Sequence, residues 1–435
     1  MKILIESSGL FLQKCGIQRY AEEIIYGLLK QFPQDNLKLL PLTEISKRSA
    51  QLKYFFDNKE INEQTIQTNF TSFELFVSKT YAELIKKIEK TNETISTQSQ
   101  FTQNHFLTKT KREFLRCMKS LLTLTLNETK FIRNRLQDIN IYHQLFDFIP
   151  SDIKKINSLK KCLTIHDIIQ AIRPDLMIGK DNSAAIGAKI KKIGTNETIF
   201  AVSQYTKNDL CNFNKNIDPK NVHVIHSGIA NHFQPISDQK VIQDVISKYQ
   251  IPKQGRFILS GFTSDPKKNV PFVIRNYLDL IKSEKIDDLF LVLTGGNKIF
   301  DNNLLKKELE IINQNKDKII LTGFVEDDEM AVLHSSCMCF CFPSLYEGFG
   351  LPVLEAMKCG APVITSNVTS LPEIAGNAAL LVDPINNDDF QTNLLKLYKD
   401  SNLRNTLSER GIQRASLFTW ENAVNQMINV YHQLM

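Results

Sequence analysis

The sequence predicts an α/β protein with two doubly wound domains, each built on a parallel sheet, and three observations support this. The chain has 435 residues, more than one hydrophobic core usually organises, so two domains of roughly 200 residues are expected. Short apolar segments typical of strands alternate with helical patterns along most of the chain. This alternation forms two series, separated by a polar stretch from about residue 231 to residue 254.

The first series opens with the strand KILIE, a loop from Ser7 to Gly16, and a helix whose apolar stripe runs from Ile17 to Phe32. Further strands are predicted in NIYHQLF, KKCLTIHD, ETIFAVS and NVHVIHSG, and a helix begins within SQYTKNDL. Residues 44–137 are less readable, because a polar stretch, TNETISTQSQFTQN, interrupts the helical fragments. We expect a mobile loop or an insertion there.

The second series contains the strands RFILSGF, DLFLVLTGG, KIILTGFV, CMCFCFP, APVITS and AALLVD, each followed by a helical segment. The polar stretch before it is interpreted as a linker. We therefore predict an N-terminal domain at 1–232, a C-terminal domain at 256–415, and a final helix at 416–435 that packs back toward the N-terminal domain. Because ligands bind at the carboxyl ends of strands in doubly wound sheets, the site is expected between the two domains.

The composition is that of an ordinary soluble protein, with 42% apolar residues. The start, MKILIESSGL, places Glu6 after only three apolar residues and predicts neither a signal peptide nor an anchor. No apolar run approaches the ~18–20 residues that span a bilayer. The eight cysteines lack zinc-type spacing, and Cys337, Cys339 and Cys341 alternate on one face of a predicted strand. Buried free thiols in a reducing cytoplasm are the main interpretation, and a metal site is the alternative.

The net charge of +6 is unevenly distributed. Between Lys109 and Arg135 there are eight basic residues and two acidic ones, and eight minus two gives +6, as much as the whole chain. Apolar residues are interleaved with them at helical spacing from Phe106 onward. A solvated helix face would explain this pattern, and so would a surface for anionic lipid over residues 106–135. Nucleic acid is disfavoured, because no aromatic-rich basic module accompanies the patch.

The stretch YEGFGLPVLEAMKCG at 346–360 follows a predicted strand and contains a glycine-rich loop and a helix. Pro352 suits the first turn of that helix and Gly360 its end. We expect Glu355 in the first turn, where its charge suits the helix dipole. Small residues that lead into a helix N-terminus favour an anion-binding site, although a capped helix without a ligand remains possible.

The longer segment EGFGLPVLEAMKCGAPVITSNVTSLPEIAGNAALLVDP closely resembles the donor-site segment of the retaining glycosyltransferases of family 4. These enzymes have the GT-B fold, in which two Rossmann-like domains face each other across a cleft, and they use nucleotide-activated sugars. The resemblance runs from about Arg256 to Tyr431, and more thinly over 1–35 and 140–230. It is closest to bacterial O-antigen and capsule mannosyltransferases, and it implies an acceptor-side first domain and a nucleotide-sugar-binding second domain.

The family's Glu-x7-Glu signature corresponds to Glu347 and Glu355. The resemblance implies that Glu347 is catalytic and contacts hydroxyls of the donor sugar, and that Glu355 accepts hydrogen bonds from the ribose. A carboxylate forms strong charge-assisted hydrogen bonds with hydroxyl groups, which suits both roles. The backbone amides next to Glu347 would face the sugar and the diphosphate; they belong to Gly348, Phe349, Gly350 and Leu351.

The segment SGFTSDPKKNV places Lys267 and Lys268 at a helix start after a strand, a pattern typical of a pyrophosphate clamp. A solvated basic turn is the alternative. The family usually has Arg-Lys here; a lysine pair keeps the charge but lacks one planar guanidinium, which puts bidentate geometry in doubt.

His166 and Asp167 lie at the end of the strand in TIHDIIQ. A lone histidine is more often structural, but the resemblance implies that this His-Asp pair lines the catalytic cleft near the sugar, with His166 as a catalytic residue. His143 in NIYHQLF is a weaker candidate for the same rim.

The segment KCGIQRY places Gly16 at the start of a helix, where its amide could approach the donor phosphates. Gln18 replaces a glycine usual in the family, which puts the closeness of that approach in doubt. Arg19 could pair with a ligand phosphate or with Glu23.

Three further segments are weaker candidates. Ser203 is predicted to cap a helix, although it would lie near the family's cleft. VIHSGI is interpreted as a structural turn. Val325 would contact the nucleotide base through its backbone, an inference from the resemblance only.

No Gly-x-Gly-x-x-Gly follows a strand and no Gly-Lys-Ser/Thr closes a phosphate loop, so NAD and ATP chemistries are disfavoured. No cofactor or metal is expected, since no carboxylate cluster is evident. The sequence thus predicts a cytoplasmic, retaining hexosyltransferase, peripheral on the inner face of the membrane. GDP-mannose is the first choice of donor and UDP-hexose the second, with a surface glycan or lipid-linked acceptor. A nucleotide-sugar 2-epimerase and an idle scaffold subunit are the alternatives.

Overall fold

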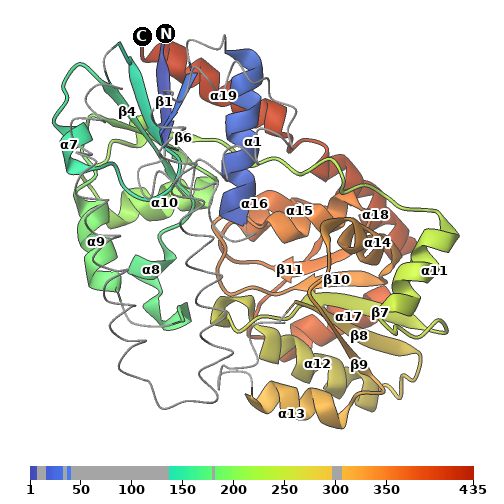
Figure 1. Cartoon of the computed structure of the whole chain (residues 1–435). Coiled ribbons are helices and arrows are strands. Elements are labelled where there is room, and N and C mark those ends of the chain that lie inside the picture. Colours follow the sequence, from blue (N-terminus) through green and yellow to red (C-terminus); the bar gives the residue numbers. More distant parts are fainter. Residues whose placement is uncertain (7–15, 33–36, 41–135, 137, 179–181, 296–305) are drawn as a thin grey trace, which may run out of the picture. The chain divides into compact units, whose positions relative to one another are not determined.

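The computed structural model describes residues 1–6, 16–32, 37–40, 136, 138–178, 182–295 and 306–435 (Figure 1). They contain two six-stranded parallel sheets covered by helices, which confirms the predicted fold class. The residues group into two compact units, of which the first comprises 1–164, 196–198 and 428–435 and the second 165–195 and 199–427. The predicted domain boundaries at 232, 256 and 416 stay predictions. The segment 44–135, including the basic stretch 106–135, lies outside the described residues.

The first sheet has the strand order β2-β1-β3-β4-β5-β6. Its strands are β1 (Ile3–Glu6), β2 (Leu37–Leu40), β3 (Ile141–Gln144), β4 (Lys160–Ile165), β5 (Glu197–Ala201) and β6 (Val222–Val224). The helices are α1 (Gly16–Gln31), α7 (Ser151–Lys154), α8 (Ile169–Ile172), η2 (Pro174–Leu176), α9 (Ser183–Lys191), α10 (Gln204–Phe213) and η3 (Pro219–Asn221). All four side chains of β3 are buried, as expected for a strand covered on both faces.

The second sheet has the order β12-β11-β10-β7-β8-β9. Its strands are β7 (Arg256–Gly261), β8 (Leu289–Thr294), β9 (Ile319–Gly323), β10 (Cys339–Phe342), β11 (Val363–Ser366) and β12 (Leu380–Val382). The helices in this part of the chain are α11 (Gln239–Lys248), η4 (Pro266–Lys268), α12 (Val270–Ser283), α13 (Lys306–Gln314), α14 (Asp327–Ser336), α15 (Leu351–Lys358), α16 (Leu371–Ala375), α17 (Asn387–Lys399), α18 (Ser401–Ala415) and α19 (Trp420–Gln433). The end of α19, from residue 428, belongs to the first unit. Strand order therefore reverses at β7, which pairs with β8 on one side and with β10 on the other.

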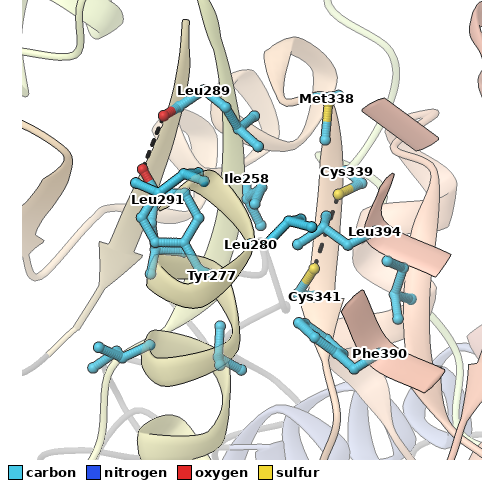
Figure 2. Packing of buried hydrophobic residues seen from close by; sticks show 14 of the residues in the cluster. Ile258, Tyr277, Leu280, Leu289, Leu291, Met338, Cys339, Cys341, Phe390 and Leu394 are labelled. Atoms are coloured by element: carbon cyan, nitrogen blue, oxygen red, sulfur yellow. Dashed lines mark hydrogen bonds between the residues drawn. The ribbon is translucent and has the colours of Figure 1, made fainter. Parts of the chain in front are cut away.

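The core of the second sheet is closed by α12 and α17, whose apolar side chains pack against β7, β8 and β10 (Figure 2). Tyr277 is buried in this core, and its hydroxyl donates to the carbonyl oxygen of Leu289 at 2.8 Å. Its ring thereby contributes apolar area while its polar end has a partner. This packing fixes the strands whose carboxyl ends carry the candidate site.

The cysteine prediction needs one correction. Cys339 and Cys341 lie on one face of β10 and point into the core, where their sulfur atoms are 3.9 Å apart (Figure 2). Cys337 is not on that strand, because α14 continues through Ser336 and Cys337 is its C-terminal capping residue. All three thiols are free and buried, and burial raises the pKa of Cys337 and Cys341.

The predicted linker at 231–254 also needs correction, since it contains the ten-residue helix α11. Asp238 caps this helix by accepting from the backbone amide of Lys240 at 2.9 Å. Glu329 of α14 accepts hydrogen bonds from the side chains of Lys248 and Tyr249. The polar composition is therefore that of an amphipathic surface helix. No helix in the described part of the chain has the length and apolarity needed to cross a membrane.

Candidate functional site

The candidate site lies at the carboxyl ends of β7 and β10, the two neighbouring strands at which the strand order of the second sheet reverses. Such a reversal point is where doubly wound sheets bind ligands. The segment after β7 carries Lys267 and Lys268, and the segment after β10 carries Glu347. Residues that are far apart in the sequence therefore meet at one edge of one sheet.

A salt bridge joins the two segments. Lys268 Nζ lies 2.6 Å from Glu347 Oε1, and Ser344 Oγ donates to the same oxygen at 2.7 Å. Glu347 is only 7% exposed, so this carboxylate depends on these partners in place of water. The ammonium of Lys268 also lies 4.7 Å from the centre of the Phe342 ring.

Lys267 anchors its segment to the one after β10 through its backbone, because its carbonyl oxygen accepts from Leu345 N at 2.7 Å. Ser344 Oγ also lies 2.7 Å from this oxygen, and its single proton serves either this carbonyl or Glu347 Oε1. Burial by itself would lower the pKa of the Lys267 ammonium, but the carboxylates of Glu347 and Asp167 outweigh this and raise the pKa. Lys267 therefore remains positively charged at neutral pH inside a mostly buried cluster.

The loop after Glu347 is held by its carbonyl groups. Ser370 Oγ lies 2.9 Å from the carbonyl oxygen of Glu347 and 2.7 Å from that of Phe349, and its single proton serves one of them at a time. The carbonyl oxygen of Gly348 accepts from Ser203 Oγ at 2.7 Å and from Thr206 Oγ1 at 3.1 Å. Side-chain hydroxyl groups thus lie within hydrogen-bond distance of three consecutive carbonyl oxygens.

The backbone amide groups of this loop, unlike its carbonyl groups, are mostly without hydrogen-bond partners among the described residues. Glu347 N donates to Thr369 Oγ1 at 3.2 Å. Among the described residues, no hydrogen bond is made by the next four backbone amides, which belong to Gly348, Phe349, Gly350 and Leu351. Gly350 is the N-terminal cap of α15 and has φ 113°, a conformation that favours glycine. Unpaired amides at a helix N-terminus, beside two lysines, form a site suited to an anion.

His166 and Asp167 follow β4 and contact this loop. A Cβ atom on Gly348 would lie 2.1 Å from the carbonyl oxygen of His166, so only glycine permits the approach. Asp167 Oδ1 accepts from Ile169 N at 3.2 Å. Burial raises the pKa of Asp167, and the Lys267 ammonium opposes that rise. The structure therefore brings both residues to Gly348 and the lysines.

The remaining predicted site residues make none of the contacts described above. Glu355 is the fifth residue of α15 and half-buried, so its predicted place in the first turn is wrong: the helix begins only at Leu351, after the Gly350 cap. Val325 is buried in the loop after β9. Gly16 is the exposed first residue of α1 and belongs to the first unit.

His143 does not line a rim, and that prediction is wrong. Its side chain is fully buried in the first unit because β3 is covered on both faces. Its Nε2 lies 2.9 Å from Thr164 Oγ1, and its Nδ1 forms a hydrogen bond with the Tyr431 hydroxyl. Burial lowers the pKa of His143 to about 3, so the ring stays neutral.

Sequence reasoning missed the residues that support the loop. The predicted cap is confirmed, since Ser203 Oγ accepts from Thr206 N at 3.0 Å, but its hydrogen bond to Gly348 was not anticipated. Glu373 and His226 were also missed. Glu373 lies within the family-like segment SLPEIAG, which could have drawn attention to it; His226 lies in a turn interpreted as structural, and no sequence signal linked it to Glu373.

Comparisons with known proteins support the second unit most strongly. Residues 241–414 match the family model described as glycosyl transferases group 1. O-antigen chain mannosyltransferase B of Escherichia coli is 36% identical over 190 residues, which cover 44% of this chain and 49% of that protein. The serotype-specific mannosyltransferase WbdA of Escherichia coli is 29% identical over 289 residues, which cover 66% of this chain and 35% of that protein. The chain thus spans about half or less of these relatives.

Solved structures extend the similarity to the full length. Anabaena Alr3699/HepE in complex with UDP has a TM-score of 0.67 at 14% identity and covers 100% of both chains. A glycosyltransferase from Rickettsia africae has a TM-score of 0.66 at 16% identity, over 100% of this chain and 98% of the other. WaaG, a glycosyltransferase involved in lipopolysaccharide biosynthesis, has a TM-score of 0.59 at 12% identity over 99% of both chains. At these identities the likeness concerns the fold.

Proposed function

We propose that the protein transfers a hexose from a nucleotide sugar to a glycan or lipid-linked acceptor, with retention of configuration. Two findings support this: residues 241–414 match the family model of the glycosyl transferases group 1, and the chain has the GT-B fold. The two mannosyltransferase relatives support GDP-mannose as the first choice of donor and surface polysaccharide synthesis as the setting. The UDP complex of Alr3699/HepE keeps a UDP-hexose as the second choice.

The observation that carries the proposal is the set of four unpaired amides after Glu347, beside Lys267 and Lys268. A nucleoside diphosphate is the leaving group of the reaction, and its charge grows as the glycosidic bond breaks. Amides already held in place stabilise this charge without having to reorganise, which favours the transition state over the ground state. The two ammonium groups add to the same effect.

The other predicted site residues contact different parts of the donor in this proposal. Glu347 accepts hydrogen bonds from hydroxyls of the sugar, and His166 and Asp167 line the sugar site against Gly348. Glu355 accepts from the ribose, and the backbone of Val325 contacts the base. In this proposal no metal ion is needed, because the lysines and amides supply the positive charge.

Thermal unfolding with GDP-mannose, UDP-glucose and ADP-glucose tests donor binding. The correct donor binds the native state and therefore raises the melting temperature. At a donor concentration of a hundred times its dissociation constant, the free energy of unfolding rises by about 2.7 kcal/mol. Product analysis by NMR then reads the anomeric configuration, with the folded Glu347→Ala variant as the inactive reference. Release of an epimerised sugar without transfer would favour the 2-epimerase, and donor binding with glycan output unchanged in Glu347→Ala would favour the scaffold. Activity abolished by EDTA would contradict metal independence.

The basic stretch 106–135 lies outside the described residues, and the proposal for it rests on sequence. We place the protein in the cytoplasm, attached to anionic lipid on the inner face of the membrane through these residues. Sedimentation with vesicles containing an anionic phospholipid, compared with vesicles of neutral lipid, is the measurement. Equal binding to anionic and neutral vesicles would contradict the proposed attachment. So would a variant with the basic residues of 109–135 neutralised that keeps full activity and still sediments with the anionic vesicles.

A further inference from the structure

The N-terminus of α10 has an unusual arrangement of hydrogen bonds. The first amides of a helix have no partner within the helix, so other groups must satisfy them. At α10, Thr206 N donates to Ser203 Oγ, but Gln204 N and Tyr205 N donate to the two carboxylate oxygens of Glu373, at 2.8 and 3.2 Å. One carboxylate from α16 thus completes the cap of another helix of the same unit.

Glu373 is itself fixed from two sides. His226 Nε2 lies 2.7 Å from Glu373 Oε1. The guanidinium of Arg414 donates from Nη2 to the backbone carbonyl of Glu373 at 2.6 Å and from Nε to that of Ile374 at 2.9 Å, which closes the end of α16. Burial by itself would raise the pKa of Glu373, but the hydrogen bonds from His226 and the two amides lower it, so the carboxylate stays charged.

The helix start held by Glu373 is the same one that holds the donor loop. Ser203 Oγ accepts from Thr206 N and donates to the carbonyl of Gly348, and Thr206 Oγ1 donates to that carbonyl as well. Ser370, the capping residue of α16, occupies the carbonyls on either side of Gly348. A displacement of α10 relative to α16 would therefore pull the loop from its two ends.

We propose that Glu373 is a positioning residue: by clamping the start of α10 to α16, it holds the loop at Gly348 with its amides available to the donor diphosphate. This inference rests on the proposed function. Glu373 does not touch the donor, and it acts through Ser203 and Gly348. Removing its charge should therefore have a larger effect on the free energy of nucleotide binding than on the free energy of unfolding.

The test compares Glu373→Gln with Asp288→Asn. Asp288 is a matched control because it also accepts two side-chain hydrogen bonds, from Arg256 at 2.9 Å and from Tyr398 at 2.6 Å, but at the opposite ends of β7 and β8. Calorimetry gives the dissociation constants of GDP and UDP, thermal unfolding gives stability, and hydrogen exchange of peptides covering residues 347–355 reports on the loop and the start of α15 without any ligand.

We expect Glu373→Gln to bind the preferred nucleotide roughly tenfold more weakly and to exchange faster at 347–355, while Asp288→Asn changes neither. Adding Ser203→Ala to Glu373→Gln should weaken binding no further, because both act through one carbonyl. Unchanged affinity and exchange in Glu373→Gln, with a fall in melting temperature like that of Asp288→Asn, would overturn the inference. A wild-type protein that binds neither nucleotide would instead reject the proposed function, and the exchange data would still decide whether Glu373 holds the loop.

Discussion

At the scale of single residues, Glu347 is the point at which charge and backbone geometry meet. One of its carboxylate oxygens contacts Lys268 and Ser344, while its backbone contacts Thr369 and Ser370. The side chain is thus restrained at both ends. A sugar hydroxyl would meet a carboxylate already in position, which reduces the entropy lost on binding.

Lys268→Ala should weaken the binding of GDP or UDP by about tenfold to a hundredfold, because a charge-assisted contact to the diphosphate is lost. It should also destabilise the fold by about 1–3 kcal/mol, since Glu347 is left buried with one partner fewer. Calorimetry and denaturant unfolding measure the two effects.

Lys248→Ala serves as the control for Lys268→Ala, because it removes a lysine–glutamate pair that is exposed at the surface. We expect it to change stability by less than about 1 kcal/mol and to leave nucleotide affinity unchanged. Equal effects of the two variants on affinity would contradict a phosphate-binding role for Lys268.

At the scale of elements, α15 carries glycines with positive φ at both ends: Gly350 before it, with φ 113°, and Gly360 after it, with φ 82°. An alanine at either position is strained by about 1–2 kcal/mol. At Gly350 the new Cβ would also lie 2.8 Å from Leu371 Cδ2, whereas at Gly360 the nearest atom is Ser408 Oγ at 3.1 Å.

Gly350→Ala should therefore reduce nucleotide affinity by at least about tenfold, because the strain falls on the amides that face the anion. Gly360→Ala should lower the free energy of unfolding by about 1–2 kcal/mol, as Gly350→Ala does, because both positions have positive φ. It should leave nucleotide affinity unchanged, because it strains the opposite end of the same helix. Thermal unfolding and calorimetry on both variants provide the comparison. If both lost affinity equally, the amide site would not be at the start of α15.

The sequence predicted strands well where apolar residues were continuous, as in β7 and β8, because a strand covered on both faces needs apolar side chains throughout. The predictions were wrong where the local pattern of polar and apolar residues suggested a different element. The surface helix α11 has a polar composition and was interpreted as a linker, and Cys337 continued an alternating pattern although the chain there still belongs to the end of α14. A local cap, in which Asp238 accepts from Lys240 N, and a tertiary hydrogen bond from Lys248 to Glu329 support α11, and the tertiary bond cannot be read from local composition.

At the scale of the whole molecule, each unit contains a buried histidine: His143 in the first and His334 in the second. Burial lowers the pKa of both to about 3, from a usual value of 6.5. Below about pH 6.5 the unfolded chain takes up these protons and the folded chain does not, so stability falls as the pH is lowered toward 3. Each group contributes a slope of about 1.4 kcal/mol per pH unit.

His334→Phe should therefore lose about 1.4 kcal/mol less stability per pH unit below about pH 6.5 than the wild type. Among the described residues His334 Nδ1 has no hydrogen-bond partner, so the substitution sacrifices no bond at that atom. Denaturant unfolding across this pH range gives the slope. His432→Gln, at an exposed position of α19, should keep the wild-type slope. An unchanged slope in His334→Phe would show that this histidine protonates in the folded protein.

The candidate site could be predicted in part because the charged residues that cluster there lie in short, contiguous motifs. Lys267, Lys268 and Glu347 each follow a strand, and parallel strands end at one edge of a sheet. The supporting residues could not be found in this way: Ser203 resembles any helix cap, and Glu373 reaches α10 from 169 residues away. Such long-range hydrogen bonds leave no local pattern in one sequence.

The reversal of strand order at β7 also has a consequence for how the molecule acquires its site. Lys268 and Glu347 are 79 residues apart in the chain, and they meet only after β10 has paired with β7 across the intervening strands and helices. Contacts so distant in sequence form late, because the entropy of closing the chain is lost before the contact can compensate for it. We therefore expect the nucleotide of the proposed function to bind only after β10 has paired with β7. It should slow unfolding of the folded protein without changing the rate of folding.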